Sequence, residues 1–266
     1  MPTLTPLRYL EARPPAGTRM LGTLVLLHAF PLNARMWEPQ MTLASEGWRV
    51  IAPQMKGMDG ASGETPDQTF DAAAGSLVDL LDALHIEQAV IGGLSMGGYL
   101  AFATFARAPR YFAGLVLADT RADADPPAAL EGRQKMLALA RTSGSVAVAD
   151  EMIPKLLGET TRRTRPNVAE QVRALAGANP AEAVAAALTC IMTRQDSAPL
   201  LSRIDCPTLV LVGEEDAVTP PALSRDMHRA IAGSELVTVS AAGHLANLEQ
   251  PDPFNAALSR FLSRAV

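Results

Sequence analysis

Residues 89–98 read Ala-Val-Ile-Gly-Gly-Leu-Ser-Met-Gly-Gly, an apolar run that leads directly into a G-x-S-x-G motif. The run 89–94 is typical of a buried strand, and residues 96–106 have the spacing of a helix. A G-x-S-x-G motif between a strand and a helix forms a tight turn that holds its serine in a strained conformation at a sheet edge. The stretch therefore predicts an α/β sheet with Ser95 at the carboxyl end of one strand.

The alternation of short apolar runs and longer amphipathic stretches extends along most of the chain. Strands are predicted at 23–28, 49–53, 89–94, 114–118, 208–212 and 236–240, with an edge strand at 7–11. Helices are predicted at 34–45, 66–84, 96–106, 221–231 and 251–263. This pattern favours a mostly parallel sheet whose two faces are both covered by helices.

The alternation stops after the strand that ends at Ala118. Helical spacing is predicted over 126–141, 145–157, 167–176 and 180–194, with no strand pattern before residue 208. Ligands of open α/β sheets bind at the carboxyl edge, so a helical insertion there would roof a pocket. We expect a core domain of residues 1–121 and 204–266 and a helical cap of residues 122–203.

Composition and charge exclude several classes of protein. A chain of 266 residues with 48% hydrophobic residues can bury a large core without a disulfide or a metal. Its 23 basic and 28 acidic residues give a net charge of −5, which offers no general attraction for nucleic acid or anionic lipid. We find neither an apolar window of membrane-spanning length nor a signal-peptide pattern, and we expect a cytoplasmic protein without nucleic-acid or membrane partners.

No cofactor or metal is predicted. Cys190 and Cys206 have no Cys or His neighbour at ligand spacing, and the four histidines form no H-x-H or H-E-x-x-H motif. The glycines at 92, 93, 97 and 98 do not fit a G-x-G-x-x-G dinucleotide-binding pattern. The chemistry is therefore expected to come from side chains alone.

A serine nucleophile needs a general base, and the chain offers four histidines. His28 ends a predicted strand, His85 closes a helical run, and His228 lies inside a helix. His244 alone lies in a short loop directly after a strand, next to Gly243, and it comes last in the chain order of serine, acid and histidine. We predict His244 as the base.

The acid that orients this imidazole should follow a strand end between the serine and the histidine. The loop after the strand 208–212 contains Glu214, Glu215 and Asp216. Asp216 lies deepest in the loop, whereas the Glu pair is typical of solvated surface charge. Asp119 is the alternative, because it follows the strand beside that of the serine. We predict Asp216 as the acid.

Two backbone N–H groups should face the oxyanion of a tetrahedral intermediate. The amide of Met96, directly after the serine, is the first. The second is expected in the loop after the strand 23–28, and we assign it to Phe30. In the same loop, His28 is interpreted as a brace and Asn33 as a helix N-cap.

Four motifs in chain order give the sequence a family resemblance. They are His-Ala-Phe-Pro-Leu at 28–32, Gly-Leu-Ser-Met-Gly-Gly at 93–98, Gly-Glu-Glu-Asp-Ala-Val-Thr-Pro at 213–220 and Ala-Gly-His-Leu-Ala-Asn-Leu-Glu-Gln-Pro at 242–251. With them the chain resembles the α/β-hydrolase superfamily, especially its carboxylesterases, enol-lactone hydrolases and cofactor-free perhydrolases. The resemblance implies a catalytic triad of Ser95, Asp216 and His244, with an oxyanion hole at Phe30 and Met96.

Two positions qualify this resemblance. The elbow carries Ser95, whereas haloalkane dehalogenases and epoxide hydrolases of the superfamily use an aspartate there, so alkyl-enzyme chemistry is disfavoured. Ala29 stands where relatives usually have glycine. If that residue needs a positive φ, alanine would cost about 1 kcal/mol or shift the loop that contains Phe30.

Apolar side chains that flank the triad or belong to the insertion are expected to select the substrate. The predicted contacts are Phe30, Trp37, Val218, Leu245, Met136, Met152 and Met192. A methionine at helical spacing is also typical of ordinary packing. The run Arg-Arg-Thr-Arg at 162–165 could bind a carboxylate, although such a run is usually a solvated helix face.

We expect a serine hydrolase that cleaves carboxylic esters of small to medium, mainly apolar substrates through an acyl-enzyme on Ser95. An enol-lactone hydrolase of aromatic-acid catabolism is the first alternative, and C–C hydrolysis or perhydrolysis would use the same triad. A binding module without turnover is the alternative from another class, and an intact triad argues against it. The expected partner is a small ester or lactone, bound by a monomer or homodimer.

Overall fold

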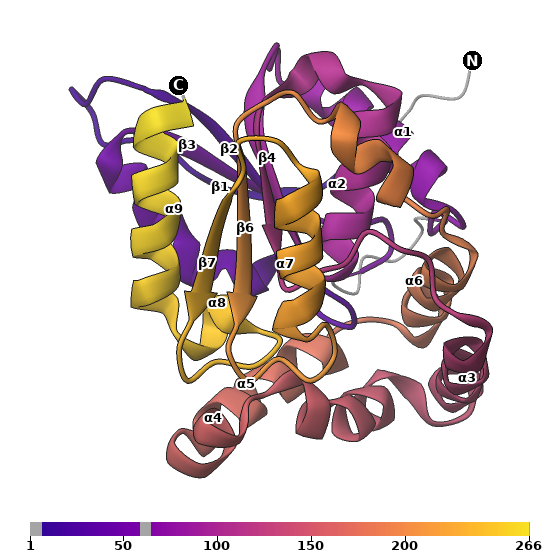
Figure 1. Ribbon diagram of the computed structural model, residues 1–266. Coiled ribbons are helices and arrows are strands. Elements are labelled where there is room, and N and C mark those ends of the chain that lie inside the picture. Colours follow the sequence, from indigo (N-terminus) through magenta and orange to yellow (C-terminus); the bar gives the residue numbers. More distant parts are fainter. Residues whose placement is uncertain (1–6, 59–64, 266) are drawn as a thin grey trace.

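The computed structural model describes residues 7–58 and 65–265 and contains a seven-stranded sheet in the order β1-β3-β2-β4-β5-β6-β7 (Figure 1). The strands are β1 (Tyr9–Ala12), β2 (Gly22–Leu27), β3 (Trp48–Pro53), β4 (Ala89–Leu94), β5 (Phe112–Ala118), β6 (Thr208–Gly213) and β7 (Glu235–Val239). β1 is antiparallel to β3, and the other pairs are parallel. The predicted mostly parallel α/β sheet is confirmed.

Helices cover both faces of this sheet. They are η1 (Ala34–Glu46), α1 (Phe70–Ala83), α2 (Met96–Arg107), η2 (Pro109–Tyr111), α3 (Pro127–Leu156), α4 (Glu159–Thr164), α5 (Pro166–Gly177), α6 (Ala181–Thr193), η3 (Ala198–Arg203), α7 (Pro221–Ala230), α8 (Ala246–Glu249) and α9 (Pro251–Ala265). In Figure 1, α1, α2 and α7 lie on one side of the strands and α9 lies on the other.

Side chains alternate along each strand and so build one core on each face. On β2, Val25 and Leu27 belong to the cluster that includes residues of α1, α2 and α7. Leu24 and Leu26, on the same strand, belong to the cluster that includes η1 and α9. The central strands are buried on both sides, which explains their continuous apolar sequences.

Two predicted helices differ from the observed ones. The segment Ala34–Glu46 is a 3-10 helix, and Pro39 inside it lacks the N–H that an α-helical hydrogen bond would need. The next helix begins at Phe70, four residues after the predicted start. Thr69 caps it there, since its hydroxyl accepts the N–H of Ala72 at 3.2 Å.

The segment between β5 and β6 is helical, as predicted, and lies at the carboxyl ends of β6 and β7 in Figure 1. We call α3 to α6 the helical insertion. α3 spans both helices predicted over 126–157 and is broken at Gly144, which has a φ of 80°. The short α4 was not predicted. Buried insertion residues such as Ala149 and Leu156 share the core cluster of the sheet, so the insertion packs directly on the strands and their loops.

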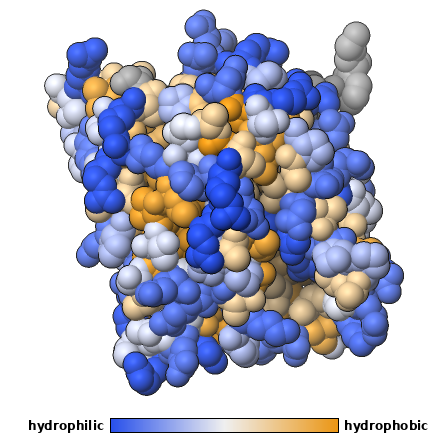
Figure 2. Space-filling view, viewed as in Figure 1, coloured by the Kyte–Doolittle hydropathy of each residue, from blue (hydrophilic) through white to orange (hydrophobic). Residues whose placement is uncertain are grey.

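The face with β7, α7 and α9 is mainly hydrophilic in Figure 2, with hydrophobic surface over β7 between the two helices. Leu236 and Val237 of this edge strand are half-buried. Within the two described ranges, no single helix has both the length and the apolar composition of a membrane span. Only α5 and α6 taken together, with a bend of 97° between them, meet those criteria.

Candidate active site

The turn between β4 and α2 gives Ser95 an unusual backbone conformation, with φ 54° and ψ −113°. Close backbone packing on both sides requires glycine. A Cβ on Gly93 would lie 2.1 Å from the carbonyl of Gly97, and one on Gly97 would lie 2.0 Å from the carbonyl oxygen of Leu27. The G-x-S-x-G spacing thus lets the chain turn sharply enough to present the serine at the sheet edge.

Three predicted residues from three strand ends form one hydrogen-bonded chain. Ser95 Oγ lies 2.8 Å from His244 Nε2, and His244 Nδ1 lies 2.9 Å from Asp216 Oδ2. Their positions follow β4, β7 and β6, whose carboxyl ends meet at the same edge. We assign the ring proton to Nδ1, so that Nε2 accepts from the serine hydroxyl. This geometry suits proton transfer from the serine to the imidazole.

Asp216 is held by its own loop. Its Oδ1 accepts the N–H groups of Val218 and Thr219 at 2.8 and 2.9 Å, and its Oδ2 accepts the Thr219 hydroxyl at 2.6 Å. Burial raises the pKa of Asp216, but the neighbouring His244 and the Thr219 hydrogen bonds outweigh it and hold the pKa below its ordinary value. Sequence reasoning missed Thr219, although an aspartate followed by N–H donors two and three residues later is an Asx-turn signal.

The alternative acid, Asp119, does not contact the imidazole. It is fully buried after β5, where its oxygens accept the N–H of Gly213 at 2.7 Å and that of Ala246 at 3.3 Å. Burial, reinforced by the nearby charge of Asp216, raises the pKa of Asp119 well above its ordinary value. We call residues 214–220, which carry Asp216, the acid loop, and residues 240–245, which carry His244, the base loop. Asp119 joins the strand end before the acid loop to the residue after the base loop, and Asp216 is the carboxylate beside the imidazole.

The amides predicted for the oxyanion hole have no acceptor among the residues that the structure describes. Phe30 and Met96 follow β2 and β4, which are neighbours paired through Leu27 and Gly93. Neither N–H donates to a protein oxygen in the described ranges. Two unpaired donors beside a buried serine are the arrangement that an oxyanion would satisfy.

The loop before η1 is braced as predicted. His28 Nε2 accepts the N–H of Met55 at 3.2 Å, and its Nδ1 lies 3.2 Å from the carbonyl oxygen of Ala29. Burial lowers the pKa of His28 to about 4, so the ring is neutral at pH 7. Ala29 is not among the residues with positive φ, so it carries no left-handed strain. Asn33 caps η1 by accepting the N–H of Arg35 and also donates to Leu175 of the insertion at 2.9 Å.

The predicted substrate contacts differ in their exposure. Half-buried are Val218, Met136, Met152 and Met192, and Phe30 is buried beside the elbow. Trp37 and Leu245 expose 1% and 0% of their surface and belong to the core cluster that contains α9. The Trp37 ring lies 6.1 Å from that of Phe254, so in this structure it packs in the core and offers no surface to a ligand. Leu245 is equally covered in the same cluster, so the expectation is corrected for Trp37 and for Leu245.

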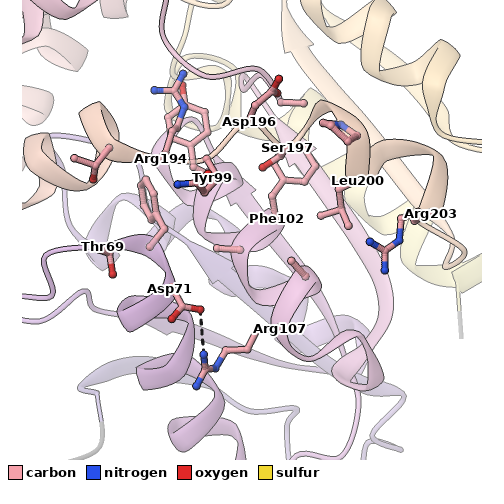
Figure 3. A pocket seen from close by; sticks show the side chains of 17 residues that line it. Thr69, Asp71, Tyr99, Phe102, Arg107, Arg194, Asp196, Ser197, Leu200 and Arg203 are labelled. Carbon is pink, nitrogen blue, oxygen red and sulfur yellow. Dashed lines mark hydrogen bonds and ion pairs between the residues drawn. The ribbon is translucent and has the colours of Figure 1, made fainter.

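A pocket of about 830 Å³ lies along α2, between the first turn of α1 and η3 (Figure 3). Tyr99, Phe102 and Leu200 contribute apolar surface, and an ion pair between Asp71 and Arg107 lies at one side. None of the three residues of the hydrogen-bonded chain lines this pocket, nor does any predicted substrate contact. We therefore do not assign it as the acyl site.

In the described ranges, no three or more His, Cys, Asp or Glu side chains are grouped so as to hold a metal ion. Arg162 and Arg163 lie exposed on α4, as a solvated helix face would.

Comparison with known proteins identifies the family, since the α/β-hydrolase fold family matches residues 22–251. The chain belongs to the α/β-hydrolase family. It is 27% identical over 241 residues to 3-oxoadipate enol-lactonase 2 of Acinetobacter baylyi, covering 91% of this chain and 88% of that protein. It is 30% identical over 258 residues to pimeloyl-(acyl-carrier protein) methyl ester esterase of Neisseria meningitidis, covering 89% and 91%.

Two solved α/β hydrolases are similar throughout. A thermophilic esterase from Thermogutta terrifontis, in a malate-bound structure, has 38% identity and a TM-score of 0.90 over 97% of this chain and 93% of that one. The enol-lactonase from Burkholderia xenovorans has 28% identity and a TM-score of 0.86 over 97% and 96%. The predicted resemblance to the esterase and enol-lactonase group of this family is thereby confirmed.

Proposed function

We propose that this α/β hydrolase cleaves carboxylic esters of small to medium, mainly apolar substrates through an acyl-enzyme on Ser95. The observation that carries the proposal is the unbroken hydrogen-bonded chain from the Ser95 hydroxyl through His244 to Asp216. The named relatives also support the proposal, because their names describe esterases and enol-lactonases.

The reaction begins when Ser95 Oγ attacks the carbonyl carbon of the ester while His244 Nε2 takes the hydroxyl proton. Asp216 holds the ring in the tautomer that can accept this proton. The amides of Phe30 and Met96 donate to the oxyanion of the tetrahedral intermediate. His244 then gives the proton to the departing alkoxide, which leaves an acyl group on the serine. A water molecule activated by the same imidazole hydrolyses that acyl group and restores the serine.

The helical insertion is proposed to act as a cap of residues 122–203 over a core of residues 1–121 and 204–266. Its place at the carboxyl edge and its hydrogen bonds to the loops around Ser95 support this role. Phe30 and Val218 beside the triad, with Met136, Met152 and Met192 of the insertion, remain the proposed apolar contacts. A small ester or lactone is the proposed partner of a cytoplasmic monomer or homodimer.

A lactone is the second candidate substrate, because enol-lactonases are among the relatives at 27% and 28% identity. Opening a lactone uses the same attack and the same oxyanion, but the leaving oxygen is part of the acyl chain, so no separate alcohol departs and deacylation releases one molecule. The two reactions therefore use the same residues and differ in the shape of the substrate and in whether an alcohol is released.

Hydrolysis of p-nitrophenyl esters from acetate to decanoate, by wild type and Ser95→Ala side by side, tests this function. We expect serine-dependent turnover with a chain-length optimum, and a loss of at least about 10³-fold in kcat in Ser95→Ala without a change in Tm. A fluorophosphonate should label Ser95 in the wild type and fail to label His244→Ala.

Retained turnover in Ser95→Ala would eliminate this mechanism. Labelling of Ser95 without turnover of any ester in the series would favour the lactone. A wild type that is neither labelled nor active would favour a binding module.

A further inference from the structure

The loop that carries His244 is held by a carboxylate outside the hydrogen-bonded chain of the site. Glu249 lies in α8, five residues after His244, and is 0% exposed. Its Oε1 accepts the N–H of Gly243 at 2.9 Å and the N–H of Leu245 at 3.1 Å. One oxygen atom thus fixes the backbone on both sides of the imidazole.

The second oxygen of Glu249 reaches the helical insertion. Oε2 accepts the N–H of Gly158, between α3 and α4, at 2.8 Å. Beside it, the N–H of His244 itself donates to the carbonyl of Leu156, at the end of α3, at 2.9 Å. A Cβ on Gly243 would lie 2.3 Å from the nitrogen of Gly158, so the two backbones touch. The base loop and the insertion therefore form one hydrogen-bonded unit.

Glu215 also hydrogen-bonds to the insertion, but it lies in the loop of Asp216 and not beside His244. This half-buried residue precedes Asp216, and its Oε2 accepts the N–H of Thr160 at 2.9 Å. No N–H next to His244 depends on it. The segment 156–160 is consequently joined to both loops of the site, and of these two glutamates it is Glu249 whose carboxylate accepts the N–H groups that flank the base.

Burying a carboxylate completely is unfavourable unless hydrogen bonds replace its hydration. Glu249 satisfies this condition with three backbone donors, and no ion pair with it is found in the described ranges. A network of this kind fixes one geometry more strictly than an apolar side chain would. Such strictness matters at His244, because a misplacement of about 1 Å at a reacting group can cost roughly 10²-fold in rate.

We propose that Glu249 is a positioning residue for the hydrolytic reaction, which sets the place of His244 and fastens it to the insertion. It touches neither the serine nor the acid of the triad, so it acts only through the base loop. This inference rests on the proposed function, since its effect is expressed through the transfer of the Ser95 proton to His244.

The test compares Glu249→Ala and Glu249→Gln with the wild type. Ala removes all three acceptor contacts, and kcat for the preferred p-nitrophenyl ester is expected to fall about 10²-fold with little change in KM. Gln keeps one acceptor oxygen in the same shape, so its loss should lie between those of Ala and the wild type. The rate at which a fluorophosphonate labels Ser95 should fall in the same order, because labelling needs the base but no ester.

Phe105→Leu is the matched control for lost stability. Phe105 is buried near the far end of α2 from Ser95, where its ring meets that of Phe112 at 5.1 Å. This variant should lower Tm while kcat and the labelling rate stay at wild-type values. All rates are measured below the melting transition of every variant.

Wild-type kcat and labelling rate in Glu249→Ala, with a Tm lowered as in Phe105→Leu, would overturn the proposal. Should Glu249→Ala fail to fold, as judged by circular dichroism, the same result in Glu249→Gln would overturn it. If Ser95 is labelled in the wild type and the Glu249 variants keep the wild-type kcat and labelling rate, the role of Glu249 is rejected and the proposed function stands. A wild type that is not labelled at Ser95 rejects the proposed function and this inference with it.

Discussion

The two loops that meet at Ser95 are held by different chemistry. Around the base loop, the buried side chains that accept backbone N–H bonds are the acids Asp119, Asp216 and Glu249. Around the loop 28–33, which carries the Phe30 amide, the buried partners are neutral.

The neutral partners are an imidazole, a thioether and two amides. His28 accepts from Met55, Gln54 accepts the N–H of Ala34 at 2.8 Å, and Asn179 donates to the carbonyl of Pro31 at 2.7 Å. The thioether of Met36 receives the N–H of Ala29 at 3.1 Å. Within the described ranges, no carboxylate hydrogen-bonds to this loop.

This difference matches the charges of the proposed reaction. The imidazole becomes positive when it takes the serine proton, and the ionised Asp216 beside it stabilises that charge. The tetrahedral intermediate carries a negative oxygen beside the Phe30 amide, where a carboxylate would repel it. Burial strengthens both effects, because the site has a lower dielectric constant than water. The two loops therefore separate the positive and negative charges of the transition state.

The largest effect on kcat is expected from a substitution among the acidic residues around the base loop. Asp216→Asn removes the carboxylate that orients the base, and kcat should fall about 10⁴-fold, the size typical of a lost triad acid. Asp119→Asn is the matched control and should keep most of the activity, because the side-chain hydrogen bonds of Asp119 within the described part of the chain come from backbone N–H groups. Ester hydrolysis by the two variants at pH 8 checks the ranking. The reverse order would reassign the acid.

The next effect concerns how the stability of the protein depends on pH through His28, in the loop 28–33. His28 has a pKa of about 4 in the folded chain and about 6.5 in the unfolded chain, so the unfolded chain binds the proton more tightly between these values. Stability should therefore fall as the pH drops from 6.5 to 4, by about 3 kcal/mol in total.

Urea unfolding between pH 4 and 8 measures this dependence. His28→Gln, which keeps an acceptor for Met55, should lose less stability than the wild type over the same fall in pH. An equal pH dependence in the two proteins would show that His28 is not the group responsible.

A smaller effect on kcat is expected when a negative charge is placed next to the loop 28–33. The Nε2 of Gln54 has no hydrogen-bond partner among residues 7–58 and 65–265, so Gln54→Glu breaks no bond that the structure shows and keeps the acceptor for Ala34. The added carboxylate repels the negative charge of the oxyanion proposed beside the Phe30 amide, so kcat should fall about tenfold.

The loss in Gln54→Glu should grow as the pH rises and the new carboxyl ionises. Gln54→Met, which adds no charge, serves as the control and should retain more activity even where it lowers Tm. Equal kcat values for the two variants at pH 8 would contradict the separation of charges.

The smallest effect is a change in how stability depends on pH when Asp119 is replaced. Burial raises the pKa of Asp119 above that of the unfolded chain, so the folded state binds this proton more tightly. The wild type should therefore lose stability as the pH rises from about 4 through the raised pKa. Asp119→Asn has no such proton, and its Tm relative to the wild type should increase between pH 5 and 8. A decrease over that range would contradict the raised pKa.

Much of the fold, and the arrangement of Ser95, His244 and Asp216, could be predicted because the signals are local. The strand before Ser95, the two glycines around it and the strand-end positions of Asp216 and His244 all lie in short segments. The 3-10 form of η1 was less accessible, since the apolar spacing of this segment resembles that of an α-helix and only Pro39 hints otherwise.

The supporting residues could not be predicted in the same way. Glu249 follows an apolar stretch and precedes Gln250, and a glutamate in such a place is ordinarily exposed. Its burial depends on Gly158, which is 91 residues away in the sequence. The core position of Trp37 likewise depends on the distant Phe254. These contacts arise only when the insertion and α9 pack against the sheet.

The close packing of the elbow limits how the enzyme can be redesigned. Any side chain at Gly93 or Gly97 would collide with backbone at about 2 Å, and one at Gly98 would meet Thr120 at 2.4 Å. A saturation library over these positions should return almost only glycine among its active members. With the insertion as the proposed cap, variants with new substrate preferences are expected from substitutions in α3 to α6, which leave Ser95 in place.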